Sequence, residues 1–188
     1  MITIISFLII ILLYLGLFAA IIFLFSFIWT SLFVRYPFVP VPMAIIPEII
    51  KCLKIESGSR VYDLGCGDGR VLSACLKASS AADYIGIERD FMPFLLAKIK
   101  LFFNRDSKKI KLLRKNFFHC DLSEASHIFI YLYPGLIEKL LPKFEKELAP
   151  GARLVSCDLP LPGKEIIEIV ELSRNKNFLV KKLFVYAF

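Results

Sequence analysis

The sequence predicts an α/β protein: a mostly parallel seven-stranded sheet with an antiparallel last strand, preceded by one N-terminal transmembrane helix. Residues 1–34 carry no charged side chain. Beyond them, short apolar runs alternate with helical segments, which favours a parallel sheet covered on both faces. The last two strand-like segments, residues 165–172 and 178–186, flank a turn-forming Asn175-Lys176-Asn177. We expect them to close the sheet as an antiparallel pair.

Three parts follow from this pattern along the 188 residues. Residues 1–34 form the transmembrane helix, residues 35–58 a Pro-rich linker with an N-terminal lid or helix, and residues 59–188 the α/β domain. Within the last two parts we expect strands at residues 61–64, 83–88, 111–118, 128–134 and 153–157, helices at 45–55, 69–78, 91–104 and 136–148, and a loop at 159–163.

The apolar N-terminal run is long enough to cross a bilayer, because a spanning helix needs about 20 apolar residues. A cleaved signal peptide would need a positive first region and a small-residue cleavage site, and neither is clear here. Trp29 and Tyr36 are suited to anchor the helix at a membrane interface. We therefore expect a retained, single-pass membrane anchor.

Charge is confined to the rest of the chain, where the net charge is +7. Arg35, Lys51 and Lys54 follow the apolar helix, whereas only the α-amino group precedes it, so the positive-inside rule places the α/β domain in the cytoplasm. A later basic run is either a solvated face or a contact with anionic lipid. The run lacks the interleaved exposed aromatics of a strand-binding surface, which argues against nucleic acid as a partner. This run comprises Lys98, Lys100, Arg105, Lys108, Lys109, Lys111, Arg114 and Lys115.

A glycine turn follows the first expected strand of the domain and has the pattern Asp63-x-Gly65-x-Gly67-x-Gly69. Alternating glycines let the backbone approach a ligand closely, and the next helix directs free N–H groups towards it. The dinucleotide pattern G-x-G-x-x-G would need a third glycine at Arg70. The turn therefore indicates a nucleotide-type cofactor other than a dinucleotide.

This register resembles motif I of the class I S-adenosylmethionine-dependent methyltransferases. The resemblance implies a Rossmann-like class I methyltransferase fold, S-adenosyl-L-methionine as cofactor, and a turn that holds the methionine end of that cofactor. By the same resemblance, the cofactor-binding residues in the turn are Asp63, Gly65, Cys66, Gly67, Asp68 and Gly69.

Two further acids follow later strands. Glu88 ends the second strand about 20 positions beyond the turn, where an acid can accept hydrogen bonds from both ribose hydroxyls. Asp121 comes just after the third strand and is suited to accept from the exocyclic amine of adenine. As an alternative, Asp121 caps a helix or a turn. We expect both acids to bind the cofactor.

The reaction centre is expected at the carboxyl end of the fourth strand, because ligands in such sheets lie outside the carboxyl ends. Tyr131 and Tyr133 are therefore the candidate residues that line it. Adenine and glutamine N-methyltransferases typically carry an Asn/Asp-Pro-Pro-Tyr/Phe element here. This chain has Tyr131-Leu132-Tyr133-Pro134 instead, which argues against those substrates.

Metal binding is not indicated by the sequence. His119 and His127 are isolated, and the five cysteines contain no C-x-x-C pair. We expect reduced cysteines that are mostly buried as small apolar side chains.

The Pro-rich segment at residues 36–42 ends the apolar helix, because each proline removes a donor and favours an extended preceding residue. It is either a stiff spacer between the membrane and the domain, or an N-terminal lid in which Phe38 and Pro40 fold over the cofactor and substrate.

The motifs in their order resemble a narrower family, the membrane-anchored lysine methyltransferases related to the mitochondrial enzyme that acts on the ATP-synthase c subunit. The resemblance implies methyl transfer to a protein lysine, with a membrane protein among the possible substrates. Two alternatives stay open: a methyltransferase of lipids or hydrophobic small molecules, and a non-catalytic membrane scaffold with the same fold. The resemblance rests on residues 36–42, the Asp63 to Arg70 motif, Gly86-Ile87-Glu88, the turn at residues 148–153 and Leu159-Pro160.

Overall fold

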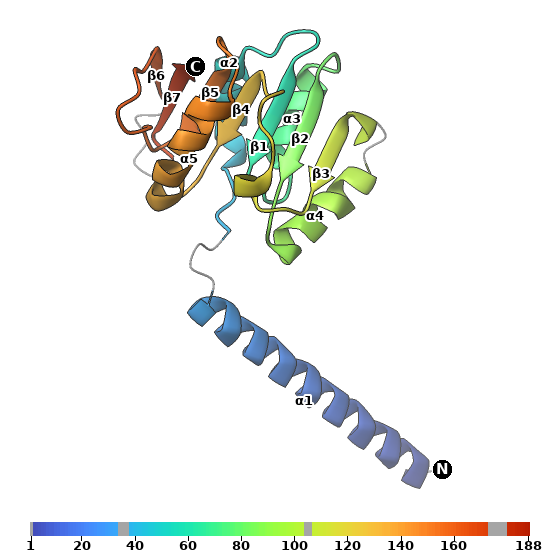
Figure 1. The fold of residues 1–188 in the computed structure, drawn as a ribbon. Helices are drawn as coiled ribbons and strands as arrows, with labels where there is room; N and C mark the ends of the chain where they lie inside the picture. The colour runs from blue at the N-terminus through green and yellow to red at the C-terminus, as the bar shows by residue number, and fades with distance from the viewer. Residues whose placement is uncertain (1, 34–37, 104–106, 173–179) are drawn as a thin grey trace. The chain divides into compact units, whose positions relative to one another are not determined.

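A computed structural model describes residues 2–33, 38–103, 107–172 and 180–188. The chain divides into two compact units, residues 1–37 and residues 38–188. Figure 1 shows the fold of each unit.

The first unit consists of the α-helix α1 (Ile2–Phe33). Its stretch Ser6–Phe25 is the one candidate membrane span in the described part of the chain, by length and composition. The side chains of residues 6–25 are all exposed. A helix that is apolar on every side cannot bury that surface by itself, so it needs an apolar environment. The side chain of Trp29, as well as the whole of Tyr36, lies outside the described residues.

The second unit is built on one seven-stranded sheet with the order β3-β2-β1-β4-β5-β7-β6. The strands β3, β2, β1, β4 and β5 are parallel, and β7 is antiparallel to both of its neighbours, β5 and β6. This topology confirms the expected mostly parallel seven-stranded sheet with an antiparallel last strand. The strands are β1 (Arg60–Leu64), β2 (Asp83–Ile87), β3 (Ile110–Leu113), β4 (His127–Ile130), β5 (Arg153–Cys157), β6 (Glu168–Glu171) and β7 (Lys182–Ala187).

Helices cover both faces of this sheet, as expected. Successive residues of a strand face opposite sides, so Val61 belongs to the core beneath α2 and α3, whereas Tyr62 and Leu64 belong to the core that includes side chains of α5. The helices of the unit are α2 (Ile46–Leu53), α3 (Arg70–Ala78), α4 (Phe91–Phe102) and α5 (Pro134–Glu147).

Two parallel strands end earlier than the sequence suggests. After β3, the side chain of Asn116 accepts the Phe118 N–H and caps a short 3-10 helix, Phe117–His119. Asparagine competes for backbone hydrogen bonds in this way, and it stops the strand despite the apolar residues that follow. After β4, Pro134 begins α5. Tyr131 and Tyr133 therefore lie in the loop between β4 and α5.

Other expectations agree more closely with the structure. The expected closing pair is present as β6 and β7, while its turn at residues 175–177 lies outside the described residues. All five cysteines are free and buried. The helix expected at residues 91–104 ends at Phe102, and residue 104 is not described.

Candidate functional site

The glycine turn lies at the carboxyl end of β1, between the ends of β2 and β4. Gly65, Gly67 and Gly69 have φ angles of 79°, 56° and 72°. Side chains with a Cβ rarely adopt this left-handed region, whereas glycine enters it freely. The Gly65 and Cys66 N–H groups donate to the Ile87 carbonyl at 2.8 and 3.1 Å, which holds the turn against the end of β2.

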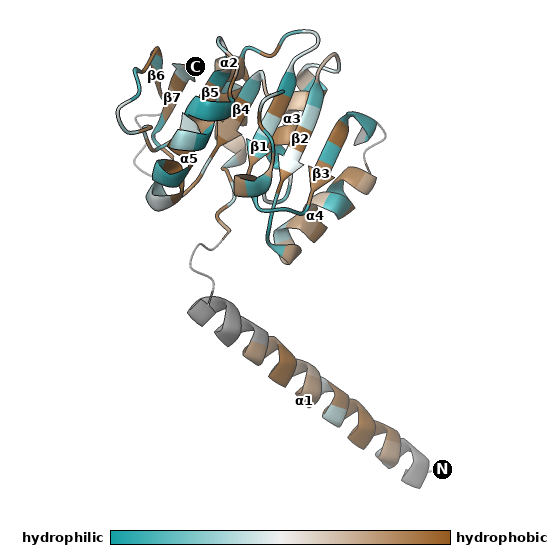
Figure 2. Ribbon diagram, in the orientation of Figure 1, coloured by the Kyte–Doolittle hydropathy of each residue, from teal (hydrophilic) through white to brown (hydrophobic). Residues whose placement is uncertain are grey.

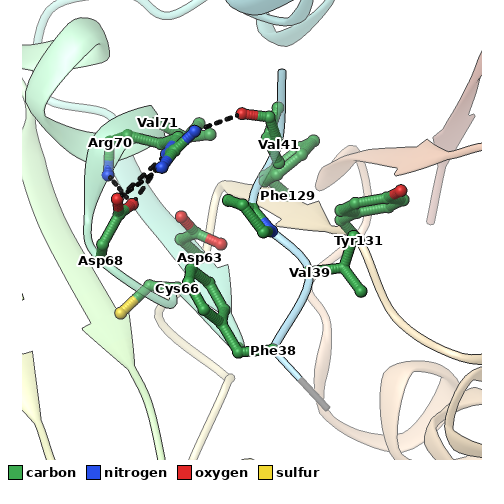
Figure 3. A pocket seen from close by; sticks show the side chains of 12 residues that line it. Phe38, Val39, Val41, Asp63, Cys66, Asp68, Arg70, Val71, Phe129 and Tyr131 are labelled. Carbon is green, nitrogen blue, oxygen red and sulfur yellow. Dashed lines mark hydrogen bonds and ion pairs between the residues drawn. The ribbon is translucent and has the colours of Figure 1, made fainter. Parts of the chain in front are cut away.

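A pocket forms between this turn and residues 38–41, which we call the strap. Figure 3 shows the strap passing alongside the turn, with the Asp63 carboxyl group among the lining side chains. Residues far apart in the sequence thus share one cavity. Its lining comprises Phe38, Val39, Pro40, Val41, Asp63, Gly65, Cys66, Asp68, Arg70, Val71, Phe129 and Tyr131.

Asp63 is the buried acid of this pocket, with 3% of its surface exposed. Burial raises its pKa well above the usual range, and the negative charges of Glu88 and Asp68 raise it further. Both charges that act on this pKa within the described residues are negative. A ligand group with positive charge would relieve this repulsion.

Glu88 is also buried and organises the turn through its carboxylate. One oxygen accepts the Gly67 N–H at 3.0 Å, and the other accepts the Asp90 N–H at 2.8 Å. A carboxylate oxygen has a second lone pair, so each can accept one more hydrogen bond. The position of Glu88 is therefore compatible with ligand hydroxyl groups as additional donors.

Asp68 forms an ion-pair network that connects the turn, the strap and α4. Arg70 contacts its two oxygens with Nε at 2.9 and 3.1 Å and Nη2 at 2.7 Å, and Lys100 of α4 contacts it as well. The guanidinium of Arg70 also donates to the Val41 carbonyl at 2.9 Å. Burial alone would raise the pKa of Asp68, but hydrogen bonds from Arg70 and Lys100 outweigh it and lower the pKa to about 2.

The network predicts an acid-dependent contribution of Asp68 to stability. Because its folded-state pKa of about 2 lies below the ordinary 3.8, the stabilisation is present above 3.8 and is lost as the pH falls towards 2. Arg70→Ala should flatten this part of the pH profile, measured as the free energy of unfolding by urea in detergent. It should also speed amide exchange in the strap. An equivalent change of the exposed Lys139 to alanine is the control, and an unaltered acid profile in Arg70→Ala would refute the role of the network.

Phe38 covers the glycine turn directly. A Cβ atom on Gly67 would lie 2.1 Å from the Phe38 ring carbon Cε2, so the ring is in contact with the backbone of the turn. Phe38 as a whole nevertheless remains 40% exposed. The strap thus occupies the side of the turn from which a ligand could approach the Gly67 backbone.

The other expected site residues are divided between the pocket and its surroundings. Tyr131 lines the pocket, where burial, followed by the nearby Cys157 and Asp158, raises its pKa. Tyr133 caps the N-terminus of α5 and is not among the lining residues. Asp121 is exposed and accepts the Ser123 N–H at 2.9 Å, which is the turn role kept as its alternative; its contact with adenine stays a prediction.

Sequence reasoning missed the partners of Asp68. In the sequence, Arg70 is the residue that breaks the dinucleotide glycine pattern and ends the Asp63 to Arg70 motif, and Lys100 is one member of a basic run. The spacing of Asp68 and Arg70, two residues apart at the start of a helix, was the available signal. The Val41 carbonyl and Lys100 are 29 and 32 residues from their partners, and no local pattern connects them.

Comparison with known proteins places this architecture in a family. The model described as "ANTKMT methyltransferase domain" matches residues 63–168. A protein-lysine N-methyltransferase of Saccharolobus islandicus is 32% identical over 142 residues, which are 74% of this chain and 88% of the relative. The human lysine N-methyltransferase named for the c subunit of ATP synthase is 29% identical over 126 residues, which are 67% of this chain but only 53% of the relative.

Solved structures agree at the level of the fold. The crystal structure of an RNA methyltransferase from Salinibacter ruber in complex with S-adenosyl-L-homocysteine superposes with a TM-score of 0.73 at 24% identity, covering 79% of this chain and 93% of the other. The sheet order and these matches define a class I S-adenosylmethionine-dependent methyltransferase. Within that class, the chain belongs to the family of the ANTKMT methyltransferase domain.

The pocket fits this cofactor chemically. S-adenosylmethionine carries a sulfonium and an α-ammonium group, and the buried Asp63 beside two acidic neighbours favours a cationic ligand. Its ribose hydroxyls are donors of the kind that a buried acid such as Glu88 can accept. The glycines of the turn also leave its backbone without side chains, and a Cβ added at Gly67 would collide with the Phe38 ring.

Proposed function

We propose that this enzyme transfers methyl groups to lysine side chains of a protein and is anchored in a membrane by α1. The observation that carries the proposal is the 32% identity over 142 residues to a protein-lysine N-methyltransferase. Relatives named for the ATP synthase c subunit and for the adenine nucleotide translocase support a protein substrate in a membrane.

The cofactor is proposed to lie between the glycine turn and the strap. Asp63 binds its positively charged end, Glu88 accepts from the ribose hydroxyls, and the turn from Gly65 to Gly69, with Cys66 and Asp68, forms the floor. Phe38 and Pro40 form the lid side of the site. Support comes from the burial of Asp63 and Glu88 and from the contact of Phe38 with Gly67.

The chemistry requires little more than positioning. S-adenosylmethionine supplies a methyl group already activated on a sulfonium. The protein must then hold a lysine amine in line with it and keep that amine neutral, because a protonated amine has no lone pair for attack. An apolar pocket lowers the pKa of an amine by disfavouring its charged form. Phe38, Phe129 and Tyr131 line the pocket and are suited to this task.

Tyr131 acts as a wall of this pocket in our proposal and not as a base. Burial raises its pKa, so its phenol keeps its proton at neutral pH. Tyr133, at the start of α5, is proposed to border the lysine entrance.

Membrane topology is proposed on the chain's own composition. The span Ser6–Phe25 of α1 crosses the bilayer, and residues 35–58 connect it to the methyltransferase domain at residues 59–188. We propose that the domain faces the cytoplasm, because Arg35, Lys51 and Lys54 follow the span and the positive-inside rule assigns a basic flank to that side.

A labelling experiment tests the function. The purified full chain is incubated with S-adenosylmethionine carrying a radioactive methyl group and with membranes from its host, and the products are separated into protein and lipid fractions. We expect label in a protein band, recovered as methyl-lysine after acid hydrolysis. Label in the lipid extract would support lipid methylation instead, and no label in either fraction would support a non-catalytic scaffold. An Asp63→Asn chain is the matched control for enzyme-dependent labelling.

A further inference from the structure

We propose that α4 is a second membrane contact of this protein, which lies in the interface of an anionic bilayer through an exposed apolar stripe. This proposal concerns the second unit alone and does not depend on the substrate of methyl transfer. Figure 2 colours most of α4 brown, although the helix lies at the outer edge of the domain.

The buried side of α4 is narrow and is made of small or medium side chains. Pro93, Ala97 and Leu101 recur every four residues and are the buried positions of the helix. Ala97 packs against the glycine turn, since a Cβ on Gly69 would lie 3.4 Å from the Ala97 Cβ.

The opposite side of the helix is apolar as well, which the core does not require. Met92, Leu96, Ile99 and Phe103 follow the i, i+4, i+7, i+11 spacing of one helix face, and all are exposed. Phe102 and Phe103 are 83% and 80% exposed and contact each other edge to face, with ring centroids 5.4 Å apart. A surface helix normally presents polar residues to water, so a contiguous stripe of this kind indicates a contact surface.

Basic side chains border the stripe on α4 and continue into the segment that follows it. Lys98 lies beside the stripe by helical spacing, and its Nζ is 5.7 Å from the Phe94 ring centroid. Lys100 lies on the other side of the stripe, where it is also paired with Asp68. The Arg114 guanidinium lies 5.0 Å from the Phe91 ring centroid. Long basic side chains can extend past apolar residues to reach phosphate groups while their stems remain in contact with the apolar surface.

An apolar stripe bordered by lysine and arginine is the pattern of helices that lie in the plane of an anionic membrane interface. A second copy of the chain is a poor partner, because two identical basic borders would repel each other. A soluble acidic protein would match the charge of the basic border, but its charge would not explain why the stripe is aliphatic and aromatic. The anionic bilayer satisfies both features.

A fluorescence experiment tests the docking of α4 in the full chain. The single tryptophan, Trp29, is changed to phenylalanine, and in this background the exposed Phe103 is changed to tryptophan as the reporter. The protein is reconstituted into nanodiscs whose lipids carry bromine on the acyl chains, which quenches tryptophan on contact. We expect at least twofold stronger quenching in discs that contain phosphatidylglycerol than in discs of phosphatidylcholine alone.

Two controls make the result specific. Ile169→Trp on β6, another exposed apolar position, reports on the domain's general proximity to lipid and should be quenched weakly in both discs. Adding Leu96→Glu and Ile99→Glu to the reporter chain should remove the quenching of Phe103→Trp, and these changes at exposed sites leave the core intact. Reporter quenching equal to that of Ile169→Trp, equal in both lipids, or dependent on the number of chains per disc would overturn the proposal.

Discussion

The Asp63→Asn enzyme is expected to lose about 100-fold in affinity for S-adenosylmethionine, a loss of roughly 3 kcal/mol, which is typical of removing one partner of a buried charged interaction. At the same time it should unfold at a higher temperature than the unaltered chain. Affinity falls and stability rises because the negative charge of Asp63 attracts the cationic ligand but destabilises the folded protein when no ligand is bound. Burial, together with Glu88 and Asp68, disfavours the charged form of Asp63, and asparagine has nearly the same shape without the charge.

The pH dependence of binding gives an independent check. In the free enzyme the pKa of Asp63 is raised, and a bound cation should lower it, so binding releases a proton wherever free Asp63 is protonated. Affinity should therefore rise with pH through the window between the two pKa values and become constant above it. Titration calorimetry of the full chain in detergent, in two buffers of different ionisation enthalpy, measures both the affinity and the protons released.

The raised pKa of Asp63 also predicts how the stability of the free enzyme depends on pH. A carboxyl group whose folded pKa is raised contributes stability below its unfolded pKa, and this contribution is lost as the pH rises through the folded value. Asp63→Asn should remove that decline. Glu88→Ala provides the contrast, because it leaves the Gly67 and Asp90 N–H groups without their acceptor and should lower affinity and stability together. Unchanged affinity in both variants would contradict the site assignment.

The sheet could be predicted from sequence because its signals are local. The apolar runs before Gly65 and around Phe129 are bounded by turn residues, and the strand-helix alternation leaves few alternatives to a parallel sheet. Strand ends were harder: Asn116 caps a 3-10 helix and Pro134 starts α5, and both override the apolar residues beside them.

In the site, too, only the residues whose signals are local can be predicted from the sequence. Asp63 lies near the end of β1 and Glu88 directly follows β2, and the pairing of these two strands brings their ends together. The contact of Phe38 with Gly67 and the bond from Arg70 to the Val41 carbonyl depend on how the strap folds back over the turn. A Pro-rich spacer and a Pro-rich lid have the same composition, so the sequence left both alternatives open.

In the proposed site, the strap would connect cofactor binding to stability through a chain of contacts. Arg70 contacts Asp68 in the turn and Val41 in the strap, and Lys100 connects the same carboxylate to α4. A change at the Gly67 surface should therefore affect both properties. A glycine that has a positive φ but open space around it can serve as a control. Its replacement by alanine measures the backbone cost alone, so the steric cost at Gly67 can be obtained by difference.

Gly67→Ala is expected to lower the free energy of unfolding by about 2–4 kcal/mol and the affinity for S-adenosylmethionine at least tenfold. Two costs add: a φ of 56° disfavours a residue with a Cβ by about 1–2 kcal/mol, and the new methyl group would meet the Phe38 ring at 2.1 Å. Gly163→Ala is the matched control, since φ there is 70° and nothing lies within 4 Å of the added Cβ. It should show the backbone cost alone and bind the cofactor normally.

A double-mutant cycle with Phe38→Ala isolates the contact between the strap and the turn. If the ring causes most of the damage in Gly67→Ala, the same change should cost about as little as Gly163→Ala once Phe38 has been removed. The coupling free energy, from urea unfolding in detergent and from calorimetry, then measures what the contact contributes to stability and to affinity. Equal costs of Gly67→Ala in both backgrounds would mean that Phe38 does not restrict this surface, and the strap would then be a spacer and not a lid.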